Sequence, residues 1–587
     1  MTAPPRNRAS RRRSRRVRTG PLILLAVGVA LAVFVGRGAT QLAAANSCTA
    51  HAVRIDVAAS PDIASAISQI AAVYDSGRHR TSGRCIAVQV TSIAAADAAA
   101  RIDGQQAAPR RPAIDAWIPD SSLWITQVRA FPLGAQTVQP AGFSVARSPL
   151  LLVMPPAAAA RTPAFARAGW RLLLPRSAGG PAVPAGLRVE VPDPARHAAG
   201  LATLIEVSRL LGGGRSGRVR FARFVYATSV APYFNTPAAL ASFTRLAAPP
   251  LDGNPVTVAT EQAVLAYDRA HPARPLAARY PVATRAALGS PELDYPYVLT
   301  STNPLRLAAA SAFGQALRGG YAQSVIRFAG FRSGSGVPDV FPRGTGLASQ
   351  LLQVAPPAAA SEAPAVLAAW DKLALGSRDL AVMDVSAVMG RRTAPGGPPL
   401  ERELSLAASA GLALFPDTAR MGLWEFAARL DGGRPYRQLV PVGPLTASLG
   451  ALTRRADLQR VTARLAPVTG QGAALYGTIL AAYRYMVASY QPGYYNAVLV
   501  LTAGAESTRH DISAATLIKR LGAATGTGRQ VALIVVVFGR SPDFAALRQA
   551  AALTGGAAYQ VSSPSQIGRV FFRAIAQRLC NPACAAP

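Results

Sequence analysis

Histidine is scarce in this chain, and the motifs of common catalytic centres are absent from the sequence. There is no G-x-S-x-G nucleophile turn and no H-E-x-x-H pair. Gly212–Arg215 lacks the lysine and hydroxyl of a phosphate loop and instead predicts a turn after a helix over Leu201–Leu211. We therefore expect a protein that is not an enzyme. The five histidines stand at no metal-ligand spacing: His51, His79, His197, His271 and His510.

Acidic residues and lysine are also scarce. The chain has 62 Lys+Arg against 29 Asp+Glu, a formal net charge of +33, and its only lysines are Lys372 and Lys519. Nucleic acid would be the usual partner of such a charge, but no recognition motif, aromatic platform or compact basic stripe accompanies it. A GC-rich genome also explains abundant arginine and alanine. We expect no nucleic acid as partner, and at most weak attraction to anionic lipid heads or wall polymers.

The N-terminus lacks acidic residues altogether and then lacks any charge. Residues 1–19 hold eight arginines and no acid, and residues 21–36 carry no charged side chain. This pattern predicts a basic cytoplasmic tail over 1–19, a transmembrane anchor over 20–36, and an extracytoplasmic remainder in the plasma membrane of a single-pass protein. A cleaved signal peptide is the alternative, because small residues at 39–46 suit a processing site. Lipid attachment at Cys48, as in a lipoprotein, is a weaker alternative, because the customary leucine is missing from the residues directly before this cysteine.

The four cysteines all follow the predicted anchor, which agrees with an oxidising exterior. They form one pair near the start and one near the end, so we predict disulfide bonds joining Cys48 to Cys85 and Cys580 to Cys584. Zinc is the alternative at Cys580 and Cys584, but no histidine or third cysteine lies nearby in the sequence. The last pair stands in a tail over 579–587.

Strand and helix patterns alternate from about residue 51 to 336. An alternating apolar strand over Ala52–Ala58 precedes Ser60 and an amphipathic stretch over Ile63–Tyr74, and further strands are predicted over Cys85–Val90 and Ile114–Ile118. With Trp117–Trp124, Arg147–Met154, Val191–Pro194, Glu261 and Tyr295–Tyr297, this order resembles the type II solute-binding proteins of bacterial uptake systems. The resemblance implies a two-lobed periplasmic-binding-protein-like domain over 48–336.

In such folds the ligand lies between the lobes, held by hydroxyls and helix N-termini, where unpaired N–H groups suit anions. The resemblance makes Ser60, Asp120, Ser121 and Ser122 the candidate ligand-binding residues, with a small solute as the possible ligand. The alternative is purely structural. Ser60 before Pro61 is a good helix N-cap, and Trp117 and Trp124 suit a core.

Three segments of the C-terminal part resemble the von Willebrand factor A (vWA) family. Asp384-Val385-Ser386-Ala387-Val388 follows an apolar strand and resembles the family's DxSxS motif. Gln471–Tyr476 resembles its threonine loop, and Val500–Gly504 the strand that carries its last aspartate. Further predicted strands lie at Met421–Phe426, Gln438–Leu445 and Ala532–Gly539. The resemblance implies an α/β, Rossmann-like doubly wound domain over 364–578, which binds protein partners.

The metal site of this second module is degenerate in the sequence. The family's two serines, threonine and two aspartates appear here as Asp384 and Ser386 only, because Val388, Ala473 and Ala503 replace the others. Magnesium needs several oxygen ligands near octahedral geometry. We expect Asp384 and Ser386 to be a relict without a bound cation, and no cofactor. Glu506 could replace the lost aspartate, or Asp384 and Ser386 could simply cap the next helix.

The glycines and prolines between the modules predict a linker over 337–363. Taken together, these patterns predict a non-enzymatic binding or scaffold protein of the cell envelope, in which a solute-binding-like module is joined to a protein-interaction module. Two alternatives stay open: an adhesive envelope protein without a solute ligand, and an accessory receptor of an uptake system.

Overall fold

The computed structural model describes residues 52–104, 113–167, 169–174, 187–231, 240–241, 254–281, 289–339, 341, 347–352, 354–392, 396–504, 511–526 and 528–580. The predicted anchor at 20–36, Cys48, Cys584 and Glu506 lie outside this part of the chain. No helix within it is long and apolar enough to cross a membrane. Cys85 and Cys580 are not free thiols, but their predicted pairing with Cys48 and Cys584 stays a prediction.

The first lobe of the N-terminal module is built on a mixed six-stranded sheet. Its strand order is β2-β3-β1-β4-β12-β5, with β1 parallel to both β3 and β4. The strands expected near residues 52, 85 and 114 are therefore present. The strands are β1 (Val53–Ala59), β2 (Arg80–Thr81), β3 (Arg84–Ser92), β4 (Ala116–Ile118), β5 (Gln139–Ser144) and β12 (Pro296–Leu299); the helices are α2 (Ala64–Ser76), α3 (Ala95–Ile102), α4 (Leu123–Arg129), α5 (Pro132–Thr137), α11 (Pro304–Leu317) and α12 (Gly320–Phe328).

The second lobe is built around one long strand that leaves the first lobe. This strand, β6 (Ala146–Met154), pairs in turn with β13, β11, β9 and β10. Its apolar residues Leu150–Met154 are fully buried, as expected of a central strand. The other elements are β7 (Leu187–Pro192), β8 (Thr228–Ala231), β9 (Asn254–Thr260), β10 (Ala277–Arg279), β11 (Glu292–Leu293), β13 (Arg332–Ser333), α6 (Pro156–Ala160), η1 (Pro163–Arg167), η2 (Trp170–Leu173), α7 (Ala198–Leu211), α8 (Gly214–Ala227) and α10 (Glu261–Ala270).

The C-terminal module is a doubly wound sheet with strand order β16-β15-β14-β19-β20-β21. All neighbouring strands are parallel except β15 and β16. Alternate residues point to opposite faces, so Leu380 and Val382 pack under one helix layer while Met383 faces the other. The strands are β14 (Gly376–Asp384), β15 (Arg420–Asp431), β16 (Arg434–Pro444), β17 (Ser448–Leu449), β18 (Leu452–Thr453), β19 (Tyr494–Thr502), β20 (Val531–Phe538) and β21 (Ala557–Val561).

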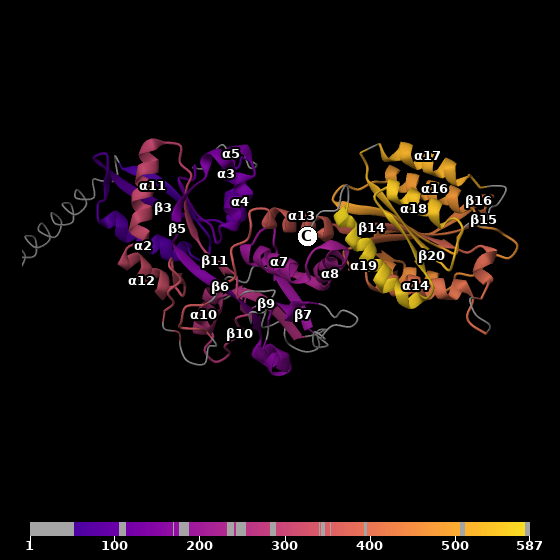
Figure 1. The fold of residues 1–587 in the computed structure, drawn as a ribbon, viewed down its shortest axis with the longest axis horizontal. Helices are drawn as coiled ribbons and strands as arrows, with labels where there is room; N and C mark the ends of the chain where they lie inside the picture. Colours follow the sequence, from indigo (N-terminus) through magenta and orange to yellow (C-terminus); the bar gives the residue numbers. More distant parts are fainter. Residues whose placement is uncertain are drawn as a thin grey trace, which may run out of the picture.

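Helices cover both faces of this sheet, as the alternating pattern predicted (Figure 1). One layer holds α16 (Leu475–Ala488), α17 (Ala514–Thr525) and α18 (Phe544–Leu553). The other layer holds α14 (Leu400–Ala413), α15 (Arg454–Thr462) and α19 (Ile567–Gln577). Short 3-10 turns complete the module: η3 (Ala387–Gly390), η4 (Pro564–Gln566) and η5 (Arg578–Cys580).

The two modules are packed against each other through helices of the second lobe. Helix α13 (Glu362–Ala374) opens the C-terminal module and lies between it and α7 and α8 (Figure 1). Tyr226 of α8 meets the ring of Phe571 on α19 edge-on, with 5.4 Å between ring centroids. The connecting segment also contacts the first module, because the Ala355 amide donates to the carbonyl of Ser290 at 2.9 Å. The modules are therefore joined by side-chain packing as well as by the chain.

Candidate functional site

The carboxyl ends of β1 and β4 carry the predicted ligand-binding residues of the N-terminal module. Ser60 follows β1, and Asp120, Ser121 and Ser122 follow β4. Ser60 is buried, and its amide donates to the Ile118 carbonyl at 3.0 Å. Parallel strands end at the same sheet edge, which explains why residues distant in sequence meet here.

Asp120 is buried beneath this edge and joins the two lobes. Its Oδ1 accepts a hydrogen bond from Trp124 Nε1 at 2.7 Å, and its Oδ2 accepts one from the Ala198 amide at 3.4 Å. Ala198 is the first residue of α7, so the Asp120 carboxylate occupies the helix start that would otherwise attract an anionic ligand. Burial, with the nearby charge of Asp62, raises the pKa of Asp120 to about 7.

Asp62 and Tyr295 extend this network; Tyr295 belongs to the segment that resembles solute-binding proteins, but its contact with Asp62 was not predicted. The Tyr295 hydroxyl donates to Asp62 Oδ2, and burial raises the pKa of Asp62 to about 6. Tyr295 is itself fully buried with a positive φ of 35°, a backbone conformation that is uncommon for a residue with a side chain. Asp62, Asp120 and Tyr295 thus fill the space beneath the candidate residues.

A cavity of about 260 Å³ lies beside this network, between the lobes. Ser121 and Ser122 line it, whereas Ser60 and Asp120 do not. The Ser122 amide donates to Asp294 Oδ1 at 2.7 Å, while no hydrogen bond of the Ser122 or Thr126 hydroxyl is seen among the described residues. Two hydroxyls are therefore available to a ligand.

The charges around this cavity are nearly balanced. Arg147 is paired with Glu292, and Arg209 with Glu206 at 2.7 Å. Asp294 adds one further carboxylate. A wall of paired charges with free hydroxyls suits a polar solute without strong negative charge better than a free oxyanion.

One wall of the cavity comes from the segment that connects the modules. Residues 354–358 line it, and Arg209 donates to the carbonyls of Pro356 and Pro357 at 3.3 Å each. The same guanidinium binds Glu362, the first residue of α13, at 2.7 Å. The Arg209 side chain therefore contacts both the cavity and the first helix of the C-terminal module.

The predicted relict of a metal site lies at the carboxyl edge of the second sheet. Asp384 is fully buried, with Oδ1 accepting from the Ser386 amide at 2.9 Å and Oδ2 from Thr502 Oγ1 at 2.6 Å. Burial raises the pKa of this carboxyl. Ser386 precedes η3 but forms no side-chain cap there, so the helix-cap alternative does not describe it. Both carboxylate oxygens are engaged by the protein.

Two further carboxylates of this edge accept hydrogen bonds from α16, whereas the buried Ser386 hydroxyl has no hydrogen-bond partner among the described residues. Asp511 accepts hydrogen bonds from the amides of Tyr476 and Gly477, at 2.9 and 2.7 Å, at the start of α16. The Tyr476 hydroxyl donates to Asp543 at 2.8 Å. No cluster of three or more His, Cys, Asp or Glu residues in the described part of the chain could hold a metal ion. Ala473 is buried where the family has threonine.

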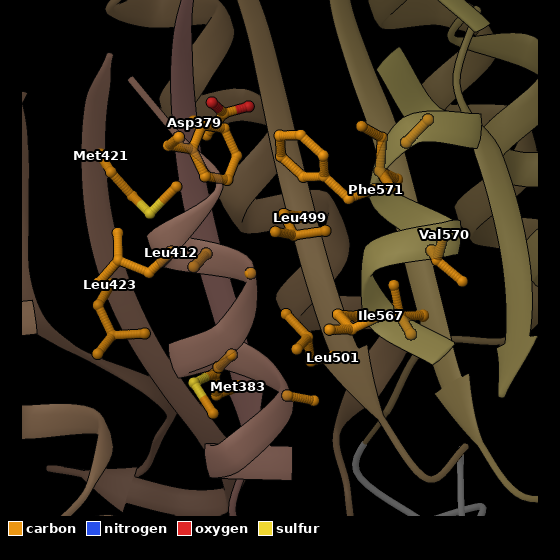
Figure 2. Close-up of a pocket in the computed structure, with 18 of the residues that line it drawn as sticks. Asp379, Met383, Leu412, Met421, Leu423, Leu499, Leu501, Ile567, Val570 and Phe571 are labelled. Carbon is orange, nitrogen blue, oxygen red and sulfur yellow. The ribbon is translucent and has the colours of Figure 1, made fainter. Parts of the chain in front are cut away.

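A narrow apolar cavity of about 80 Å³ lies on the other face of this sheet, under α14 and α19. Figure 2 shows Leu499 and Phe571 pointing into it, with Met383 toward one end and the Asp379 carboxylate at the other. Burial raises the pKa of Asp379 to about 7, and its Oδ2 has no hydrogen-bond partner in the described structure. The packing between the sheet and this helix layer thus leaves a small apolar space.

Comparison with known proteins gives a family match for the first module. Residues 55–332 match the family model described as bacterial extracellular solute-binding protein. The first module is a solute-binding-protein-like domain. Its matched range lies within the boundaries expected from the sequence.

Two relatives are similar to only part of this chain. Two uncharacterized proteins of Mycobacterium tuberculosis, MT1884 and Rv1836c, are each 31% identical over 142 residues, which is 24% of this chain and 20% of the relative. The chain thus spans about a fifth of the length of these relatives.

Among solved structures, the sulfate-binding protein SubI of M. tuberculosis is 17% identical (48% of this chain, 87% of that chain, TM-score 0.34). A ferric binding protein of Campylobacter jejuni is 10% identical (54% and 99%, TM-score 0.39). A von Willebrand factor type A protein of Catenulispora acidiphila is 15% identical (35% and 43%, TM-score 0.26). Likenesses this distant carry no argument about ligands.

Proposed function

We propose that this protein is a non-enzymatic receptor of the cell envelope, anchored in the plasma membrane by residues 20–36. Its interlobe cavity binds a small polar solute, and its vWA-like module binds a protein partner. Occupancy of the cavity is passed between them through residues 354–358 and α13. The observation that carries the proposal is Arg209, which contacts the cavity, the connecting segment and Glu362 at once.

The chemistry of the cavity supports a neutral or zwitterionic polar solute. Ser122 and Thr126 offer free hydroxyls, whereas the arginines already have carboxylate partners. Asp120 holds the start of α7, which leaves that helix dipole unavailable to a ligand anion. Sulfate or phosphate would therefore compete with a carboxylate that the fold already holds in place.

The vWA-like module is proposed to bind its partner without a divalent cation. Hydrogen bonds from the protein take the place of a cation at the Asp384 carboxylate, because Thr502 and the Ser386 amide each donate to one of its oxygens. Rebuilding a magnesium site would require breaking these bonds and adding carboxylate ligands.

A thermal-shift screen of the full-length protein in nonionic detergent tests the solute proposal. Amino acids, sugars, polyols and inorganic anions are the probes, since a ligand that binds only the folded state raises its apparent stability. The Thr126→Trp variant fills the cavity, and Gln69→Trp on the exposed side of α2 is the matched control. We expect a neutral polar probe to stabilise the wild type and the control, but not Thr126→Trp.

A protein without a solute ligand is the second candidate, and the buried Asp62–Tyr295–Asp120 network is the observation that favours it. That network closes the deeper part of the interlobe space. If no probe stabilises the wild type, or if Thr126→Trp responds as the control does, the structural or adhesive role is the better account.

A further inference from the structure

A second cleft lies at the boundary between the two modules. It is lined by α8 of the second lobe and by α18, β21 and α19 of the vWA-like module. Its volume is about 600 Å³. Arginines line it from both modules: Arg215 and Arg218 on α8, Arg548 on α18 and Arg573 on α19. We propose that this cleft binds a phosphate-bearing ligand that bridges the two modules.

Among the residues that the structure describes, no aspartate or glutamate lines the cleft to balance the charge of the four arginines. Within the described residues, none of the four forms an ion pair or a side-chain hydrogen bond. Like charges gathered in one concave site repel one another, and low-dielectric walls strengthen their field. An anion entering the cleft relieves that repulsion.

Another arginine at the same module boundary, Arg209, has its charge neutralised by carboxylates of the protein. Arg209 on α7 meets two carboxylates, Glu206 and Glu362, each at 2.7 Å. Arg215 and Arg218 lie only a few residues further along the chain on the next helix, yet have no such partner. Because basic residues outnumber acidic ones by 33, many arginines of this chain lack an acidic partner, and what distinguishes these four is that they line one concave surface.

Apolar packing holds the walls of the cleft together. Tyr226 packs against Phe571, and the guanidinium of Arg223 lies 4.8 Å from the ring centroid of Phe572. These contacts join α8 to α19 independently of the four arginines, so the helices that carry Arg215, Arg218 and Arg573 are held beside each other without an anion.

The remaining lining suits phosphate oxygens and an attached organic group. Gln560 and Gln577 offer amide donors, and Tyr559 offers both a hydroxyl and a ring face. Burial raises the pKa of Tyr559, so its hydroxyl stays protonated and can donate. Guanidinium groups match phosphate oxygens with paired hydrogen bonds. The cleft is much larger than inorganic phosphate requires, which indicates a phosphorylated molecule or a phospholipid headgroup.

Binding to the full-length protein in nonionic detergent tests this proposal. Pyrophosphate and glycerol phosphate are the soluble probes, measured by calorimetry and thermal shift at physiological salt. Mixed micelles containing phosphatidylglycerol, with phosphatidylcholine as reference, probe the headgroup source. The Arg215→Gln/Arg573→Gln variant removes one charge from each module. Arg402→Gln/Arg520→Gln changes net charge equally at two exposed helix positions outside the cleft.

We expect saturable binding by the wild type and the control, weakened at least about tenfold in Arg215→Gln/Arg573→Gln, since a charge-assisted hydrogen bond contributes about that much. Without any anion, the cleft variant should melt above the control variant, because repulsion is relieved. A response to phosphatidylglycerol alone assigns the headgroup as the source. Equal binding by both variants, or no response to any probe, overturns the proposal. The solute screen above is unaffected by either result.

Discussion

Each module places a buried aspartate at or just beyond the carboxyl end of a sheet strand, yet their surroundings differ. Asp120 follows β4 and Asp384 ends β14, and in both the two carboxylate oxygens accept hydrogen bonds from the protein. Beside Asp120 lies a polar cavity with free hydroxyls, lined by Ser121 and Ser122. Near Asp384, Asp511 and Asp543 accept hydrogen bonds from α16, and the buried Ser386 hydroxyl has no hydrogen-bond partner among the described residues.

The two carboxylates differ in what adjoins them. In the C-terminal module, the Thr502 hydroxyl and the Ser386 amide are the hydrogen-bond partners of Asp384. In the solute-binding-like module, Asp120 satisfies one helix start, but the adjoining space remains open.

Removal of the Asp384 carboxylate should have the largest effect. Asp384→Ala leaves the Ser386 amide and the Thr502 hydroxyl buried without an acceptor, so we expect a loss of roughly 3 kcal/mol in unfolding free energy. Asp384→Asn keeps an acceptor and should lose less. Denaturant unfolding measures both, with and without Mg²⁺ or Mn²⁺. A clear stabilisation of the wild type by either cation, absent from Asp384→Ala, would show a working metal site.

The buried carboxyls predict a dependence of stability on pH. Burial raises the pKa values of Asp120 and Asp379 to about 7 and that of Asp62 to about 6, from 3.8. The folded state therefore holds protons that the unfolded state has lost, and stability falls as pH rises from about 4 to about 7. Melting temperatures of the wild type, Asp120→Asn and Asp379→Asn over this range test the sign. Each variant should show a shallower fall.

The Trp124 hydrogen bond should have a smaller effect. Trp124→Phe removes the indole donor to Asp120 Oδ1, and a net hydrogen bond to a carboxyl contributes about 1–2 kcal/mol. Trp170 is the matched control, because it is equally buried and its Nε1 has no hydrogen-bond partner in the described structure. Both variants lose similar volume. If Trp124→Phe is no less stable than Trp170→Phe, Asp120 does not depend on this donor.

The apolar cavity of the vWA-like module predicts a small gain. Gly411 lies within α14 at the cavity, and an added Cβ would meet only Ile567 Cγ1, at 3.9 Å. Gly411→Ala should therefore raise the unfolding free energy by about 1 kcal/mol through helix propensity and filling. Gly422→Ala is the contrasting variant, because its Cβ would approach the Val442 amide nitrogen within 2.7 Å and should destabilise. Equal effects would contradict the packing described here.

The fold was largely predictable because both modules repeat strong local patterns. The apolar run ending at Asp384 and the β-branched run near Val531–Phe538 each fill one strand of the sheet. The sites were less predictable, because they depend on contacts between distant residues. Thr502 meets Asp384 across 118 positions, and Tyr295 meets Asp62 across 233. Nor could spacing show that Arg209 would contact the segment between the modules.

The central claim is that the interlobe cavity and the vWA-like module are coupled through Arg209. Hydrogen–deuterium exchange of the full-length protein tests it most directly, with and without the solute that gives the largest thermal shift. We expect slower exchange at residues 354–358 and at the start of α13 when the solute binds, and loss of this protection in Arg209→Gln. Protection confined to the lobes, with exchange in α13 unchanged, would contradict it.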